Sequence, residues 1–302
     1  MRSFWKIMAI LALVGVCFCA VGFATGANRN GFYIDRSGLQ MNSKEYSLKQ
    51  EKSIGAVSEI YVDVLAVDVR LAQAEDYGLE IYSRDDSDIS YTQENGKLFI
   101  KQGDNFRNWR FNFMSFDIGL RKEYITIYLP EGAFLDAVDI KYASGRVNVD
   151  ALKCKAFNLK QLSGDTVISN FNADEATMNT SSGSIELRNS KAGSFNIKLL
   201  SGSLTASGLE TKGLKAELTS GDTVLSGVLT GSTQINTISG NVKLEIQGQE
   251  QQYNRNIEIL SGRVKVNGSR SSAGSVNYSA DNILDINVTS GNVDITFIPP
   301  AL

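Results

Sequence analysis

The sequence contains no histidine among its 302 residues. This absence excludes Ser-His-Asp and Cys-His nucleophilic systems and the common histidine-based zinc sites. The sequence also lacks a large excess of one charge, since it has 30 Lys and Arg and 33 Asp and Glu. No overall positive field is therefore available to hold nucleic-acid phosphates. We therefore expect neither histidine-dependent catalysis nor nucleic-acid binding.

Cysteine is scarce as well. Cys17 and Cys19 lie in an apolar N-terminal segment, and only Cys154 lies in the rest of the chain. No disulfide can therefore form within the body of the protein. We expect Cys154 to be a small core residue.

The one long hydrophobic run is at the N-terminus. Arg2 and Lys6 precede about twenty mostly apolar, uncharged residues that end near residue 27, a length that spans a bilayer as a helix. The small residues Ala24-Thr25-Gly26 also suit a cleavage site, so a cleaved signal peptide stays open beside the uncleaved anchor. In both cases the body is exported, because the basic flank stays inside. We expect a single-pass cell-membrane protein with an extracytoplasmic body, or a secreted protein if the segment is cleaved.

A Ser-Gly dipeptide recurs through the second half of the chain. Five successive intervals of 19 residues separate the first six copies, and intervals of 22 and 29 follow. The serines are Ser144, Ser163, Ser182, Ser201, Ser220, Ser239, Ser261 and Ser290. The fifth residue after each Ser is apolar, the third is mostly apolar, and the fourth is mostly polar. This alternation predicts a strand with one inward face.

A second alternating pair precedes the Ser-Gly dipeptides, as with Phe157 and Leu159. Each repeat therefore contains at least two strands, and the glycine at the corner between them permits a sharp or left-handed backbone. A coil of 19 residues cannot bury its inward side chains alone, so successive coils should stack and pair their strands in parallel.

These patterns predict an all-β fold, a single-stranded parallel β-solenoid of about 19-residue coils preceded by one N-terminal transmembrane helix. We expect Pro299-Pro300 to block strand addition at the C-terminal end. The predicted parts are an anchor or signal peptide at 1–27, a juxtamembrane linker at 28–56, an irregular opening section of the solenoid at 57–143 and the regular Ser-Gly repeat at 144–302.

The motifs "GKLFI" (96–100) and "ITIYLP" (125–130), followed by the ladder of "SGxVxV" coils, resemble the bacterial putative-adhesin family of β-strand-repeat domains of unknown function, also called toastrack domains. The resemblance covers roughly residues 55–298. It implies a β-solenoid tethered at the cell envelope, in some cases linked to envelope-stress systems, with no established catalytic residues.

The segment 105–122, "NFRNWRFNFMSFDIGLRK", interleaves aromatic and basic side chains. Aromatics beside arginine are typical of binding hot spots, and such surfaces also suit anionic lipid headgroups. The alternative is a strand whose phenylalanines close the open end of the solenoid. The candidate partner-binding residues are Phe106, Trp109, Arg110, Phe111, Phe113 and Phe116.

Carboxylates offer the remaining route to catalysis. Asp165 and Asp222 both follow a repeat serine by two positions, but three coils, or about 14 Å, separate them. Glycosidase pairs need about 5–10 Å. Arg146 lies one coil before Asp165, so we expect a cross-coil salt bridge there instead.

Two further features could bind ligands. Asp85, Asp86 and Asp88 are dense enough to hold calcium but lack the ordered spacing of a calcium loop, which favours a solvated turn. Polar insertions at 248–255 and 268–282 are either binding loops or tolerated insertions. We expect no metal and no cofactor.

The sequence therefore favours a non-enzymatic, membrane-anchored extracytoplasmic module that binds or scaffolds in a bacterial cell envelope. Its expected partner is an envelope protein, a glycan or an anionic lipid surface. The alternatives are an accessory subunit of an envelope-stress membrane complex and a carboxylate-dependent polysaccharide-cleaving enzyme.

Overall fold

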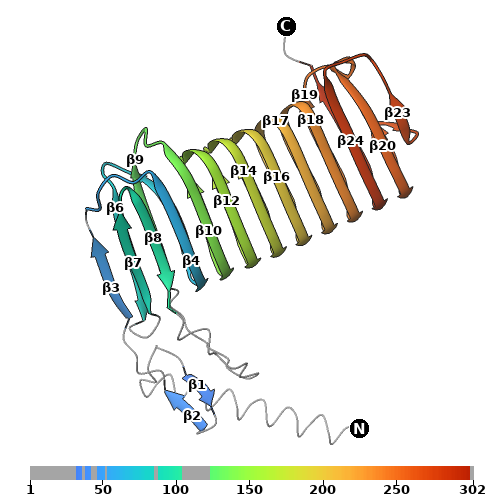
Figure 1. Ribbon diagram of the computed structural model, residues 1–302. Coiled ribbons are helices and arrows are strands. Elements are labelled where there is room, and N and C mark those ends of the chain that lie inside the picture. Colours follow the sequence, from blue (N-terminus) through green and yellow to red (C-terminus); the bar gives the residue numbers. More distant parts are fainter. Residues whose placement is uncertain are drawn as a thin grey trace, which may run out of the picture.

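The computed structural model describes residues 32–35, 38–41, 46–51, 53–84, 88–103 and 123–299. These residues form an all-β structure with a two-stranded and a 23-stranded sheet, and one short 3-10 helix, η2 (Glu250–Gln252) (Figure 1). The prediction of an all-β fold with mostly parallel strands is confirmed.

Most of the described residues lie in strands that are joined at tight corners. The strands are β1 (Phe32–Asp35), β2 (Gly38–Met41), β3 (Tyr46–Glu51), β4 (Glu59–Ala66), β5 (Asp68–Ala74), β6 (Gly78–Arg84), β7 (Ile89–Glu94), β8 (Lys97–Gln102), β9 (Tyr124–Pro130), β10 (Leu135–Ser144), β11 (Arg146–Asp150), β12 (Lys153–Ser163), β13 (Asp165–Ser169), β14 (Asn172–Ser182), β15 (Ile185–Arg188), β16 (Lys191–Ser201), β17 (Leu204–Ser220), β18 (Thr223–Ser239), β19 (Val242–Gln247), β20 (Tyr253–Ser261), β21 (Val264–Val266), β22 (Ser269–Ser271), β23 (Gly274–Val276), β24 (Asn282–Ser290) and β25 (Val293–Ile298).

The large sheet folds into two faces, and each coil supplies one strand to each face (Figure 1). The first face contains the strands that lead into the Ser-Gly corners, and its parallel ladder runs β8, β4, β10, β12, β14, β16, β17, β18, β24, β20. The second face contains the strands that leave the corners, and the long strands β17 and β18 each begin on this face and end on the first. In the regular coils paired residues are 19 apart, as in Leu159 with Met178 and Val149 with Ile168.

The core lies between the two faces. The fifth residue after each repeat serine is at most 7% exposed, and these residues pair in register with their neighbours, as Leu225 does with Leu244. Phe157, Phe171 and Phe195 pack together in the core, with successive ring centroids 5.3 and 6.4 Å apart. Burial of each such side chain stabilises the fold by about 1.5–3 kcal/mol. The inward column predicted from the repeat is therefore confirmed.

The corners explain why the repeat requires glycine. Gly183 has φ +119°, and a Cβ atom there would lie 1.7 Å from the carbonyl oxygen of Gly164. The Gly183 N–H donates to the carbonyl of Ser201 in the following coil at 3.0 Å. Corner backbones of successive coils are thus in direct contact, and a side chain would separate them.

The C-terminal end differs from the predicted order of successive coils. β24 lies between β18 and β20, and β25 lies between β19 and β21, so the last coil in sequence is inserted before the one that precedes it. β22 and β23 then pair antiparallel with β21 and β20. The prediction that Pro299-Pro300 block strand addition at the open edge is wrong, because β25 is an internal strand and the antiparallel strands cover the edge.

At the N-terminal end, too, one coil is inserted out of sequence order and antiparallel strands cover the edge. β4 lies between β8 and β10, and β5 lies between β9 and β11. β7 pairs antiparallel with β8, β6 with β9, and β3 with β6. β3 falls within 28–56, the segment expected to be a linker.

No helix among the described residues is long and apolar enough to cross a membrane. The predicted anchor at 1–27 lies outside the described residues.

Candidate binding groove

Some of the sites predicted from the sequence lie outside the described residues, and others lie within them. Phe106, Trp109, Arg110, Phe111, Phe113 and Phe116 lie outside the described residues, as do Asp85 and Asp86. The described polar insertions support the end of the stack: 248–255 contains η2 and the start of β20, and 268–282 contains the antiparallel strands β22 and β23. Arg255 forms an ion pair with Glu250 across the first insertion.

Cys154 lies in the core as expected and is a free thiol. Burial raises its pKa to about 12, so the thiolate is suppressed at neutral pH. It therefore offers no nucleophile.

The aspartates at the corners hold backbone groups. Asp165 Oδ1 accepts a hydrogen bond from the Ser184 N–H at 3.1 Å, and Asp222 Oδ1 accepts one from the Asn241 N–H at 2.7 Å. The predicted salt bridge between Arg146 and Asp165 is wrong, because the carboxylate turns toward the following coil, where a corner N–H lacks a ladder partner. Within the described ranges, no group of three or more His, Cys, Asp and Glu residues could hold a metal ion.

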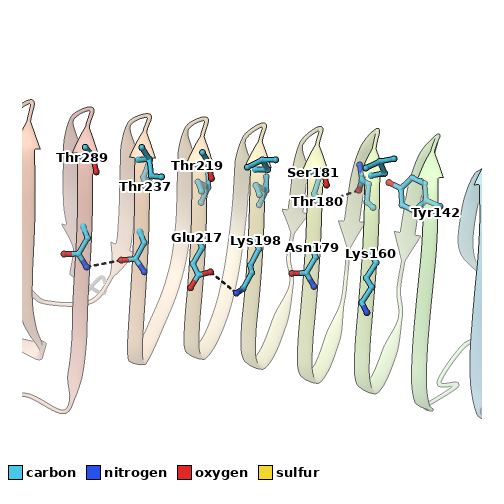
Figure 2. Close-up of a pocket in the computed structure, with 18 of the residues that line it drawn as sticks. Tyr142, Lys160, Asn179, Thr180, Ser181, Lys198, Glu217, Thr219, Thr237 and Thr289 are labelled. Atoms are coloured by element: carbon cyan, nitrogen blue, oxygen red, sulfur yellow. Dashed lines mark hydrogen bonds and ion pairs between the residues drawn. The ribbon is translucent and has the colours of Figure 1, made fainter. Parts of the chain in front are cut away.

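A groove of about 1250 Å³ runs along the first face beside the corners (Figure 2). It is lined by the three residues that precede each corner, in every coil from β4 to β20. Because side chains alternate along a strand, the middle residue of each three points inward and the other two point outward. The outward residues form two parallel rows, and the groove lies between them.

Beneath the groove, the inward residues place their side chains in the core. Tyr142, Gln161 and Thr180 are buried there, and the Thr166 hydroxyl donates to Gln161 Oε1 at 2.8 Å and lies 3.2 Å from the Tyr142 hydroxyl. Burial raises the pKa of Tyr142, which keeps its phenol neutral. The core beneath these coils is therefore uncharged at neutral pH.

The outward residue three positions before each corner forms what we call the polar row. Lysines occupy its β10, β12 and β16 positions, and glutamates its β17 and β20 positions. Lys198 Nζ lies 2.9 Å from Glu217 Oε2, and the Asn287 amide donates to Asn236 Oδ1 at 3.0 Å (Figure 2). From β4 to β20 the row reads Asp63, Lys141, Lys160, Asn179, Lys198, Glu217, Asn236, Asn287, Glu258.

Paired lysines determine the protonation state at the centre of the polar row. Hydrogen bonds from Lys215, the larger effect, and from Lys198 lower the pKa of Glu217. Its carboxylate is therefore ionised at neutral pH and cannot act as a general acid there.

The outward residue immediately before each corner forms the alternating row. Four of its five large members are among the most exposed apolar side chains of the described part of the chain, with Leu162 at 61%, Leu200 at 59%, Ile238 at 56% and Leu260 at 83%, whereas Leu65 is half-buried. Small residues lie between them. From β4 to β20 the row reads Leu65, Ala143, Leu162, Ser181, Leu200, Thr219, Ile238, Thr289, Leu260.

Sequence reasoning missed this groove. The signal was present, since the residue before each repeat serine switches between large apolar and small from one copy to the next. It is interrupted in sequence order, where Leu260 follows Ile238 directly. A row of exposed apolar residues beside a charged row is suited to binding a macromolecular surface rather than to chemistry.

Comparisons with known proteins agree with the architecture. The family profile described as Toastrack DUF4097 matches residues 57–296. A "putative adhesin" from Bacteroides fragilis has a similar structure at 16% identity, with a TM-score of 0.51, and the match covers 85% of this chain and 98% of that one. A second "putative adhesin", from Parabacteroides distasonis, matches at 12% identity with a TM-score of 0.48, over 85% and 98% of the two chains. No curated protein matches.

Proposed function

Since the chain belongs to the Toastrack DUF4097 family, we propose that it is a non-enzymatic binding and scaffolding module of a bacterial cell envelope, adhesin-like, with the groove as its binding face. In this proposal residues 1–27 anchor the chain in the cell membrane and the stack stands on the extracytoplasmic side. The partner is an envelope protein, a glycan or an anionic lipid surface.

The groove is the observation that carries this proposal. Exposed large apolar side chains recur along the first face from β12 to β20 beside lysines and glutamates, whereas the corner aspartates hold the backbone and the central glutamate is ionised. Exposed apolar rows of this extent mark interaction surfaces. The printed name of the similar structure from Bacteroides fragilis, "putative adhesin", points to the same class of function.

The location is tested on the full chain in bacterial membranes. We expect the mature protein to retain residues 1–27 by intact-mass measurement and to resist extraction at high salt, because hydrocarbon rather than charge holds a spanning helix. A soluble exported chain that begins near Ala27 or Asn28 would identify a cleaved signal peptide instead.

The binding face is tested with two matched lysines. Immobilised full-length chain is probed with purified peptidoglycan, phosphatidylglycerol vesicles and purified envelope proteins, including the chain itself. We expect Lys160→Glu, in the groove, to weaken the retained probe at least about tenfold, the loss that one reversed close charge pair can cause. Lys191→Glu, two coils along on β16 and outside the groove, should leave binding unchanged. Equal effects of both variants, or soluble products released from the glycan probe, would contradict the proposal.

A further inference from the structure

The alternating row has a regularity that exists only in the folded chain. Large residues lie on the coils of β4, β12, β16, β18 and β20, and small residues lie on the coils of β10, β14, β17 and β24. Large side chains therefore recur at every second coil, about 9.6 Å apart. Insertion of β24 between β18 and β20 places Thr289 between Ile238 and Leu260 and completes the pattern.

Such a row is complementary to itself. If a second row runs in the opposite direction, shifted so that odd coils face even coils, every large side chain lies over a small one. We infer that the groove face docks a second copy of this chain, antiparallel to the first, about a two-fold axis between β16 and β17. The inference rests on the proposed binding role of the groove and names its partner.

The two-fold symmetry places each row of one copy opposite the same row of the second copy. A two-fold axis that lies in the interface along the strand direction reverses the axis of the stack and preserves the direction of the strands. The alternating row then faces the alternating row, and the polar row faces the polar row. One register must satisfy both rows at once.

In the alternating row, this register places four large residues on four small ones. Each pairing occurs twice because of the symmetry. The pairings between copies are Leu200 with Thr219, Ile238 with Ser181, Leu162 with Thr289 and Leu260 with Ala143.

In the polar row, the same register places opposite charges together. Lys198 faces Glu217 of the second copy, and Lys141 faces Glu258. The other two pairings join Lys160 with Asn287 and Asn179 with Asn236, so no like charges meet. A shift of one coil would instead place Leu200 on Leu200 and Lys198 on Lys198, which is unfavourable for both packing and charge.

The size of the interface predicts its strength. The facing coils, at about 4.8 Å per strand, form a strip roughly 38 Å long and only two side-chain rows wide. This area is smaller than the roughly 800 Å² per partner of a standard stable interface. Pairing is therefore weak in solution and is strengthened where anchoring raises the local concentration. Antiparallel order places the two N-terminal ends at opposite ends of the pair, which suits chains anchored in apposed membranes.

Cysteine cross-linking tests the register. The full-length chain carries Cys17→Ser and Cys19→Ser, and Cys154 is buried. Leu200→Cys and Thr219→Cys chains with different tags are mixed and oxidised mildly. We expect a mixed disulfide dimer at least about fivefold more abundant than the dimer of either variant alone, because disulfide formation needs Cα atoms within about 7 Å. Thr205→Cys mixed with Val224→Cys, which lie beyond the same corners on the second face, is the matched control.

A groove mixture that cross-links no better than this control overturns the inference. A Leu200→Cys dimer as abundant as the mixed dimer also overturns it, because that result requires like charges to face one another.

Charge exchange supplies the second measurement. Sedimentation of the detergent-solubilised chain should show weaker self-association for Lys198→Glu and recovery for Lys198→Glu combined with Glu217→Lys, since the exchange restores opposite charges between copies. Failure of the double variant to recover counts against the register. A chain that stays monomeric yet retains a glycan or lipid through Lys160 contradicts this inference alone, whereas a chain that pairs but is not exported contradicts only the proposed location.

Discussion

In the middle of the stack, from β12 to β17, each coil pairs with the coil before it and the coil after it in sequence, whereas at both ends it does not. The β24–β25 coil is inserted at one end and the β4–β5 coil at the other, and antiparallel strands cover both edges. The middle is fixed by contacts between identical corners. The ends are fixed by the need to leave no unpaired parallel edge, which would otherwise recruit further strands.

The largest expected effect is a difference in folding stability between a core variant in the middle of the stack and a surface variant at its end. Leu225→Asp should abolish cooperative folding, because it places an unpaired charge in the buried column at a position where the side chain is 1% exposed. Leu260→Asp, on an end strand and 83% exposed, should change the stability of the dilute monomer by about 0.5 kcal/mol or less. Thermal unfolding followed by circular dichroism measures both. Cooperative unfolding of Leu225→Asp at the parent temperature would refute the buried column.

The next effect compares two glycines that both have positive φ. Gly183→Ala in the middle should cost about 3 kcal/mol or more, since φ is +119° and the new Cβ would meet a backbone oxygen. Gly268→Ala at the C-terminal end, with φ +76° and nothing within 4 Å, should cost only about 1–2 kcal/mol. Urea unfolding midpoints give the comparison. Similar losses for the two variants would mean that contact between corners does not set the spacing of the coils.

The smallest effect concerns a hydrogen bond at the N-terminal end. The Tyr124 hydroxyl donates to Glu80 Oε1 at 2.6 Å, and this bond raises the pKa of Tyr124 from 10.0 to about 12. A raised folded-state pKa means that the stabilisation is complete below pH 10 and is lost as the pH rises toward 12. Tyrosinate absorbance should therefore show a late-titrating phenol that is missing in Tyr124→Phe and shifted to lower pH in Glu80→Gln. An unchanged titration in Glu80→Gln would exclude the hydrogen bond as the cause.

The parallel coils and the buried column could both be predicted because they depend on local periodicity. A strand alternates every two residues, and a glycine at every corner reports a backbone that excludes a side chain. The salt bridge predicted for Asp165 is wrong for a reason that the sequence periodicity cannot show. Its partner depended on which neighbouring coil offered an unsatisfied backbone N–H, and Ser184 in the following coil does.

The sequence by itself determined the length of a coil, the position of its corner and the side chains that point inward, because these follow from nearest-neighbour geometry along one strand. Only the tertiary structure decided the order of the terminal coils, since that order depends on which strand covers which edge and not on distance in sequence. The groove depends on this decision. In sequence order Ile238 and Leu260 would be neighbours, but the inserted β24 places Thr289 between them, so that large and small side chains alternate along the whole row.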